Sequence, residues 1–191
     1  PSRRSDQRIR DMCKSHPDHL GHPDHLGHAG EPGHADPERV AEDLVLLAVK
    51  AYTIAGIAPQ MRALFGDDTM VVTLQNGLPW WYFQNFSGPH AGYRLKSADP
   101  SGVIEQNIEA RRIIGCVVYP AGEIVAPGIV KRLEGDRFPV GELDGKETER
   151  AKLVHDVLVK AGLKSRVLKD IRSEIWLKAW LQENQLSDVE I

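Results

Sequence analysis

A lysine on the apolar side of a predicted helix is the residue of this sequence best suited to chemistry. At 100° per residue, Lys178 lies about 20° from Ile171 and about 60° from Ile175 on the helical wheel of residues 171–185, on the same apolar side. Apolar surroundings lower the pKa of a lysine, which makes Lys178 a candidate proton donor. The alternative interpretation is a lysine whose stem covers a hydrophobic edge while its amine stays in water, and the pattern fits it equally well.

Two further polar residues follow predicted buried strands. Lys50 closes the run DLVLLAVK, and Asn76 lies near the end of TMVVTLQNG. Ligands of open α/β sheets bind at the carboxyl ends of parallel strands, so we expect both side chains to border one crevice. Lys50 could face a phosphate, a carboxylate or a polarised carbonyl there. The alternatives are a solvent-exposed lysine and an ordinary Asn-Gly turn.

Histidines are concentrated near the N-terminus. The hexapeptide HPDHLG occurs twice in tandem over residues 16–27, and six of the eight histidines lie between His16 and His34. Imidazoles bind Zn²⁺, Ni²⁺ and Cu²⁺, but the prolines and glycines between them oppose a helix that would fix the ligands. We therefore predict low-complexity sequence here and no metal site.

The hydrophobic pattern predicts a βαβ unit. Short apolar runs at 43–50 and 69–77 are typical of strands buried on both faces of a parallel sheet. Residues 53–65 between them have apolar positions at helical spacing. Short connections between strand, helix and strand favour a right-handed parallel crossover.

Shorter elements are predicted after this unit. Residues 78–112 are expected to form a short helix and a long loop, and residues 113–142 to form short strands separated by turns. Helices are predicted at 146–161, with Gly162 as C-cap, and at 171–185, with Asp170 as N-cap.

Composition limits the function classes. The 191 residues are 41% apolar and carry a net charge of −3, without a basic excess or a long apolar run. These values oppose a nucleic-acid partner and a membrane partner. Two cysteines cannot form a disulfide framework, which favours a reducing compartment. We therefore expect a cytoplasmic protein that binds small molecules or other proteins. Residues 1–42 have nine apolar residues and no aromatic one, so we expect this segment to be disordered.

Several segments, in this order and spacing, resemble the ketopantoate reductase family, the 2-dehydropantoate 2-reductases. They are DLVLLAVKA, TLQNGLPWW, IIGCVVYPAGEIVAPGIV followed by Gly141-Glu142, and DIRSEIWLKAW. The resemblance runs from about residue 43 to residue 180. It implies a Rossmann domain that binds NADPH, followed by an all-helical C-terminal domain. It also implies reduction of 2-dehydropantoate to pantoate, a step towards pantothenate.

The resemblance also implies roles for single residues. Lys50 matches a lysine beside the cofactor, and Asn76 matches an asparagine near the nicotinamide and the substrate. Ala121 lies where the family makes a backbone contact to the cofactor. Lys178 matches the catalytic lysine that protonates the keto oxygen of the substrate as hydride arrives.

The sequence departs from the family pattern near both ends. Residues 1–42 contain no G-x-G-x-x-G motif, whose glycines let a pyrophosphate approach a helix N-terminus. The family places asparagines four and eight residues after its catalytic lysine, where this sequence has Gln182 and Leu186.

We therefore expect an α/β fold with a partial Rossmann-like, doubly wound domain that lacks its first βαβ unit. The start of an all-helical C-terminal domain should follow it. The predicted segments are a low-complexity region at 1–42, the second half of an NADP-binding domain at 43–168, and the first helix of a truncated helical domain at 169–191.

Two functions remain open at this point. One is NADPH-dependent reduction of 2-dehydropantoate or a related 2-keto acid, by a monomer or a homo-oligomer. The other is a non-catalytic fragment or interaction module that pairs its open sheet edge with another chain.

Overall fold

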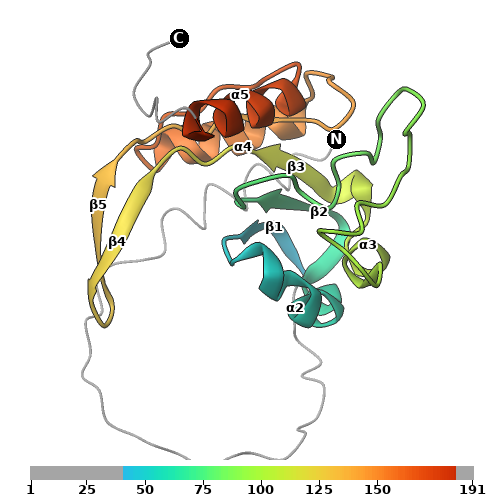
Figure 1. The fold of residues 1–191 in the computed structure, drawn as a ribbon, viewed down its shortest axis with the longest axis horizontal. Helices are drawn as coiled ribbons and strands as arrows, with labels where there is room; N and C mark the ends of the chain where they lie inside the picture. The colour runs from blue at the N-terminus through green and yellow to red at the C-terminus, as the bar shows by residue number, and fades with distance from the viewer. Residues whose placement is uncertain (1–40, 184–191) are drawn as a thin grey trace, which may run out of the picture.

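The computed structural model describes residues 41–183, which form a mixed α/β fold (Figure 1). The strands are β1 (Glu42–Leu47), β2 (Phe65–Thr73), β3 (Ile113–Cys116), β4 (Ala121–Ala126), β5 (Ile129–Glu134) and β6 (Val140–Gly141). The helices are α2 (Ile54–Met61), α3 (Val103–Asn107), α4 (Glu149–Lys160) and α5 (Ile171–Glu183), with 3₁₀ turns at Ala51–Thr53, Arg62–Leu64 and Ala110–Arg112. The disorder predicted for residues 1–42 lies almost entirely outside the described residues.

A four-stranded sheet forms the centre of the fold. Its strand order is β1-β2-β3-β6, with β1, β2 and β3 parallel and β6 antiparallel to β3. In the ladder, Leu46 lies opposite Val72, which lies opposite Ile114. The predicted βαβ unit is therefore confirmed as β1, α2 and β2, and the α/β class is confirmed with it.

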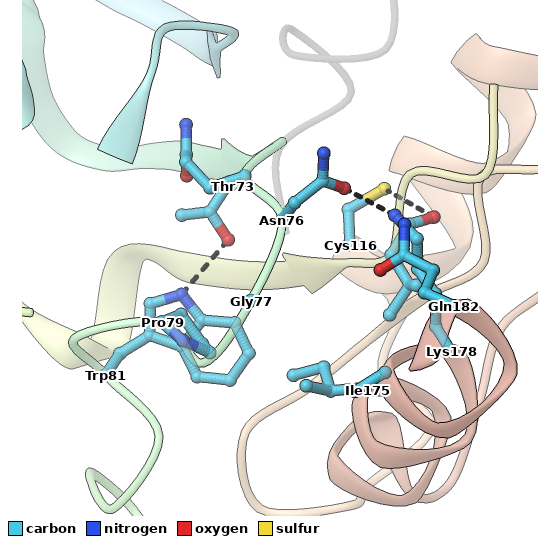
Figure 2. A pocket seen from close by; sticks show the side chains of 12 residues that line it. Thr73, Asn76, Gly77, Pro79, Trp81, Cys116, Ile175, Lys178 and Gln182 are labelled. Carbon is cyan, nitrogen blue, oxygen red and sulfur yellow. Dashed lines mark hydrogen bonds between the residues drawn. The ribbon is translucent and has the colours of Figure 1, made fainter. Parts of the chain in front are cut away.

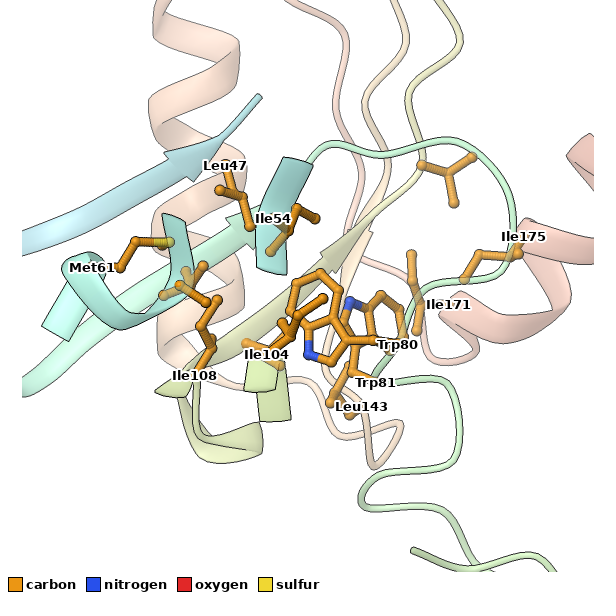
Figure 3. Close-up of a cluster of buried hydrophobic side chains, with 14 residues drawn as sticks. Leu47, Ile54, Met61, Trp80, Trp81, Ile104, Ile108, Leu143, Ile171 and Ile175 are labelled. Atoms are coloured by element: carbon orange, nitrogen blue, oxygen red, sulfur yellow. The ribbon is translucent and has the colours of Figure 1, made fainter. Parts of the chain in front are cut away.

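Each face of the sheet packs against its own hydrophobic cluster, because successive strand residues point to opposite faces. Val71 and Ile113 belong to the cluster that α2, α3 and the Trp80-Trp81 turn cover (Figure 3). Val72 and Ile114 belong to the cluster beneath α4. The fold is therefore layered, with a hydrophobic cluster on each face of the sheet. Because β1 and β2 are parallel, their carboxyl ends lie at the same edge of the sheet.

The prediction of a strand buried on both faces is wrong for β1. Leu46 is 48% exposed, whereas the neighbouring Leu47 is buried. Within the described part of the chain, β1 has a neighbour only on its β2 side. Burial depends on what pairs with and covers a strand, and the apolar run alone does not contain that information.

The helix predicted at 53–65 is shorter than expected. The structure divides this segment into α2 and its flanking 3₁₀ turns, and Phe65 already belongs to β2. Gly56 and Pro59 lie inside α2, and both weaken a helix, since glycine adds chain entropy and proline lacks an amide hydrogen.

Helix α4 begins and ends close to the predicted positions. Its N-cap is Thr148, whose hydroxyl oxygen accepts a hydrogen bond from the amide of Ala151 at 3.2 Å. Gly162 follows the helix with a φ of +82°, the left-handed conformation expected of a glycine C-cap.

The segment after β3 forms a hairpin that extends away from the sheet (Figure 1). Strands β4 and β5 pair antiparallel through a turn at Gly128, which has a φ of +74°. Large apolar side chains on both strands are exposed, namely Ile124, Val125, Ile129, Val130 and Leu133. This hairpin is separate from the sheet edge described below.

Candidate functional site

Helix α5 carries Lys178, and its first turn is capped as predicted. The carboxylate of Asp170 accepts hydrogen bonds from the amides of Arg172 and Ser173, at 3.1 and 3.0 Å. The hydroxyl of Ser173 donates to the same carboxylate, and these bonds lower the pKa of Asp170. The cap fixes where the helix begins and therefore which residues face the sheet.

Two contacts fix α5 against the rest of the fold. The Arg172 guanidinium donates to the carbonyls of Tyr82 at 2.6 Å, Gln84 at 2.7 Å and Leu143. Ile171 packs against β3 at Gly115, where an added Cβ would lie only 2.9 Å from the isoleucine. A larger residue in β3 would push the helix away, so the glycine permits this close approach.

The structure brings Lys178 and Asn76 together (Figure 2). The Lys178 ammonium donates a hydrogen bond to Oδ1 of Asn76, which Figure 2 shows, and a second one to the carbonyl of Val118. Lys178 is only 9% exposed, and burial lowers the pKa of its amine. A lysine ammonium has three N–H groups, so one remains for a ligand after these two bonds.

A cavity of about 40 Å³ lies beside this pair. Its lining residues come from the end of β2, the following turn, β3 and α5, and include Thr73, Gly77, Trp81, Cys116, Ile175 and Gln182 (Figure 2). The Trp81 indole donates to the Thr73 hydroxyl at 3.0 Å, which holds the ring as one wall. A space of this size holds a small polar group, such as a keto oxygen or a water molecule.

Cys116 reaches the same cavity but is not a nucleophile. Burial raises the pKa of its thiol from 9.0 to about 12, so the sulfur stays protonated at neutral pH. Only the thiolate attacks electrophiles. Cys116 therefore contributes an uncharged wall beside Lys178.

Lys50 and Ala121 do not line this cavity. Lys50 is exposed just beyond the carboxyl end of β1, and Ala121 is the first residue of β4. The Gln75 amide joins the two strand ends by donating to the carbonyls of Leu47 and Val49, the latter at 3.2 Å. Lys50 and Asn76 thus border one sheet edge, as the sequence predicts.

A second polar network lies near Lys178, whose Nζ is 5.8 Å from the centroid of the Tyr119 ring. The Tyr119 hydroxyl donates to the Glu174 carboxylate at 2.9 Å, and Arg166 donates to both oxygens of that carboxylate at 3.1 and 3.2 Å. Burial and the bond to Glu174 raise the pKa of Tyr119 to about 12. The sequence analysis missed this network, although Glu174 lies one helical turn before Lys178.

The Gly141-Glu142 pair has a structural role. Glu142 is 4% exposed and accepts two hydrogen bonds of 2.6 Å from the Arg150 guanidinium. The Thr148 hydroxyl donates to the same carboxylate at 2.5 Å. A paired buried carboxylate joins the end of β6 to the start of α4 and leaves no free acid at this point.

The histidine repeat lies outside the described residues. Within residues 41–183, no group of three or more His, Cys, Asp and Glu side chains is placed to hold a metal ion. No helix in this part of the chain is long and apolar enough to cross a membrane.

A parallel sheet with a βαβ crossover, and polar residues gathered at its carboxyl edge, place this chain among the Rossmann-like α/β proteins. Residues 28–79 match the model of a family described as "Ketopantoate reductase PanE/ApbA". A curated 2-dehydropantoate 2-reductase of Mesorhizobium japonicum is 51% identical over 140 residues, which are 73% of this chain and 43% of that protein. Over these residues the chain is similar to the ketopantoate reductase family.

Solved structures agree with this assignment. A protein of Ralstonia solanacearum assigned to the ketopantoate reductases has a TM-score of 0.70 at 36% identity, covering 73% of this chain and 43% of that one. A 2-dehydropantoate 2-reductase of Geobacter metallireducens has a TM-score of 0.56 at 25% identity, over 74% and 40%. A D-mandelate dehydrogenase solved with NADH shares the fold at 23% identity and a TM-score of 0.56, over 76% and 40%. The chain thus spans less than half the length of these relatives.

Proposed function

We propose that the chain carries the proton-donating part of a 2-keto-acid reductase site, and that the acid is 2-dehydropantoate. The observation that carries the proposal is the position of the Lys178 ammonium, buried beside a small cavity and bonded to Asn76 and Val118. The family relationship supports the same assignment.

The chemistry of the reaction suits this arrangement. When hydride adds to a keto carbon, negative charge builds on the keto oxygen, and a nearby ammonium both stabilises that charge and supplies the proton. Burial lowers the pKa of Lys178, which brings its proton affinity closer to the pH of the reaction. Asn76 orients the amine through Oδ1, and its side chain is one of those that line the cavity.

The hydride requires a reduced nicotinamide, and the residues of this edge fit such a cofactor. At this edge Lys50 offers an exposed cation for a phosphate and Asn76 an amide. Ala121, the first residue of the separate β4–β5 hairpin, would add its backbone. Gln75 Oε1 is buried without a hydrogen-bond partner in the described structure and faces the same edge. We propose NADPH as the cofactor. The NADH held by D-mandelate dehydrogenase supports a nicotinamide dinucleotide in general.

The segment boundaries at 1–42, 43–168 and 169–191 belong to this proposal. The start of β1 at Glu42 and the start of α5 at Ile171 support them. The family match begins at residue 28, so it crosses the first of these boundaries.

Oxidation of NADPH tests the proposed function. The whole chain is mixed with NADPH and 2-dehydropantoate, absorbance is followed at the nicotinamide band, and pantoate is identified by mass spectrometry. We expect turnover that requires the keto acid. No pantoate at any NADPH concentration would contradict the proposal and favour the non-catalytic alternative.

Cofactor affinity is a separate measurement. The 191 residues contain no G-x-G-x-x-G motif, so we expect these residues alone to bind NADPH weakly. Quenching of tryptophan fluorescence reports binding, because Trp81 lines the cavity. An affinity in the low micromolar range would show that the glycine loop is dispensable.

A further inference from the structure

Glu174 and Lys178 occupy positions i and i+4 of α5, the spacing at which glutamate and lysine commonly form an ion pair on a helix. They do not form one here. Among the residues the structure describes, no carboxylate makes an ion pair with Lys178, and the ion pair of Glu174 is with Arg166. A buried lysine and a buried carboxylate one turn apart are therefore kept separate.

Two side chains hold the Glu174 carboxylate in its present position. Arg166 contacts both of its oxygens, and the Tyr119 hydroxyl donates to one of them at 2.9 Å. The Glu174 side chain is 9% exposed, whereas that of Arg166 is 58% exposed. The carboxylate thus accepts three hydrogen bonds, none of them from Lys178, and the residue that supplies two of them lies at the surface.

The groups that face Lys178 come from every element around it. The Cys116 thiol comes from β3, the Asn76 amide follows β2, and the Tyr119 ring follows β3 with its centroid 5.8 Å from Nζ. On α5 itself, Glu174 precedes the lysine by one turn and the Gln182 amide follows it by one turn. Of these groups, Glu174 is the one carboxylic acid.

We propose that Arg166 and Tyr119 act as positioning residues that hold the Glu174 carboxylate away from Lys178, so that the amine keeps no counterion and its proton remains transferable. The consequence for catalysis rests on the proposed function. The effect on the amine itself does not, because it follows from contacts within this chain.

An ion pair between Glu174 and Lys178 would change the pKa of the lysine by an amount that can be estimated. A carboxylate within about 4–6 Å of a lysine favours the charged form and shifts the pKa by about one to three units. In the present structure burial acts in the opposite direction and lowers the pKa of Lys178. If Arg166 or the Tyr119 hydroxyl is removed, Glu174 can turn to Lys178 at the i, i+4 spacing, and the shift should reverse.

Titration of the lysine by NMR tests the proposal without substrate or cofactor. The ¹³Cε resonance of Lys178 is followed against pH in the full chain of 21.3 kDa and is assigned by its loss in Lys178→Arg. We expect the midpoint in Arg166→Met and in Tyr119→Phe to rise by about one to three pH units. Tyr119→Phe keeps the aromatic ring beside the amine and removes only the hydroxyl.

Two further variants separate this mechanism from a general loss of positive charge. The double variant Arg166→Met/Glu174→Gln should return the midpoint to the wild-type value, because no carboxylate is left to pair with Lys178. Lys164→Met removes a surface cation that pairs with Asp136 at 3.1 Å, and it should leave the midpoint unchanged.

An unchanged midpoint in both single variants would overturn the proposal, and so would a raised midpoint that persists in the double variant. The outcomes are distinct from those of the proposed function. If the midpoints move as expected while the wild type turns over no keto acid, the positioning role stands and the reductase assignment falls.

Discussion

Oδ1 of Asn76 accepts a hydrogen bond from Nζ of Lys178, although 102 positions separate the two residues in the chain. The asparagine is positioned by the end of β2, and the lysine by a helix that Arg172 holds against the Tyr82–Gln84 turn. The bond therefore reports whether the sheet edge and α5 are correctly assembled.

Asn76→Asp should disturb the proton affinity of Lys178. The substitution places a carboxylate where an amide oxygen now accepts from the ammonium. We expect the pKa of Lys178 to rise by about one to three units, which makes the amine a poorer donor at neutral pH. The ¹³Cε titration measures the shift, and NADPH oxidation measures the loss of kcat.

Asn76→Ala is the matched control for that substitution. It removes the same hydrogen bond without adding charge, so the pKa of Lys178 should not rise. Equal pKa values in the aspartate and alanine variants would show that the amine does not contact residue 76 in solution.

The thiol of Cys116 should make stability fall at alkaline pH. Its pKa is raised to about 12 in the folded chain against 9.0 for an ordinary thiol, so folding favours the protonated form. That contribution is complete below pH 9 and is lost as the pH rises towards 12. By pH 10 the wild type should have lost about 1 kcal/mol more of its free energy of unfolding than Cys116→Ala has lost.

Urea unfolding of both proteins at pH 7 and pH 10 gives this difference. Because Tyr119 also has a raised pKa, both proteins should lose stability over this range, and only the excess belongs to Cys116. An identical loss in the two proteins would mean that the thiol is solvated in the folded state.

Arg172→Ala should destabilise the fold. The guanidinium donates to three backbone carbonyls that belong to two separate segments, and hydrogen bonds from a charged donor contribute about 1.5–3 kcal/mol each. We expect a loss of about 3 kcal/mol or more in the free energy of unfolding. Arg132→Ala, on the exposed strand β5, should lose less than about 0.5 kcal/mol in the same measurement.

Much of this fold could be predicted from local patterns. The apolar runs around Val71 and Ile113 predict buried strands because strand burial leaves a continuous signal in the sequence. The place of Lys178 on an apolar helix face follows from the helical period. The role of Asp170 as the N-cap of that helix follows from the capping preferences of aspartate. These features depend on residues that are neighbours in the chain.

The remainder depends on contacts between distant segments. The exposure of Leu46 follows from the edge position of β1, and the Val118 carbonyl that binds Lys178 has no side-chain signature at all. Tyr119 and Glu174 are 55 positions apart, so neither residue type indicates the other. Sequence reasoning therefore predicts the helix face on which Lys178 lies and cannot predict the distant groups that contact it.

Limited proteolysis tests the predicted boundary before residue 43. Residues 1–42 contain too few apolar side chains to form a packed core, so trypsin should cleave first between Arg3 and Arg39. The remainder should resist cleavage and is identified by its mass. Cleavage within 43–180 while Arg3 to Arg39 stay intact would contradict the predicted segments.

The catalytic role of Lys178 is the central claim, and substitution of this lysine tests it most directly. kcat is measured for the oxidation of NADPH by 2-dehydropantoate in the wild type, Lys178→Ala, Lys178→Arg and Lys169→Ala. Lys169 is the control, because it lies one residue before the cap of α5 and its side chain is 80% exposed.

Loss of a positioned proton donor costs a factor of about 10² to 10⁴ in rate, and we expect Lys178→Ala to lose kcat by that factor. Lys178→Arg should recover little, since a guanidinium stays protonated and differs in shape. Lys169→Ala should retain the wild-type kcat. An active wild type whose Lys178→Ala variant also retains full kcat would contradict the assignment of Lys178 as the proton donor.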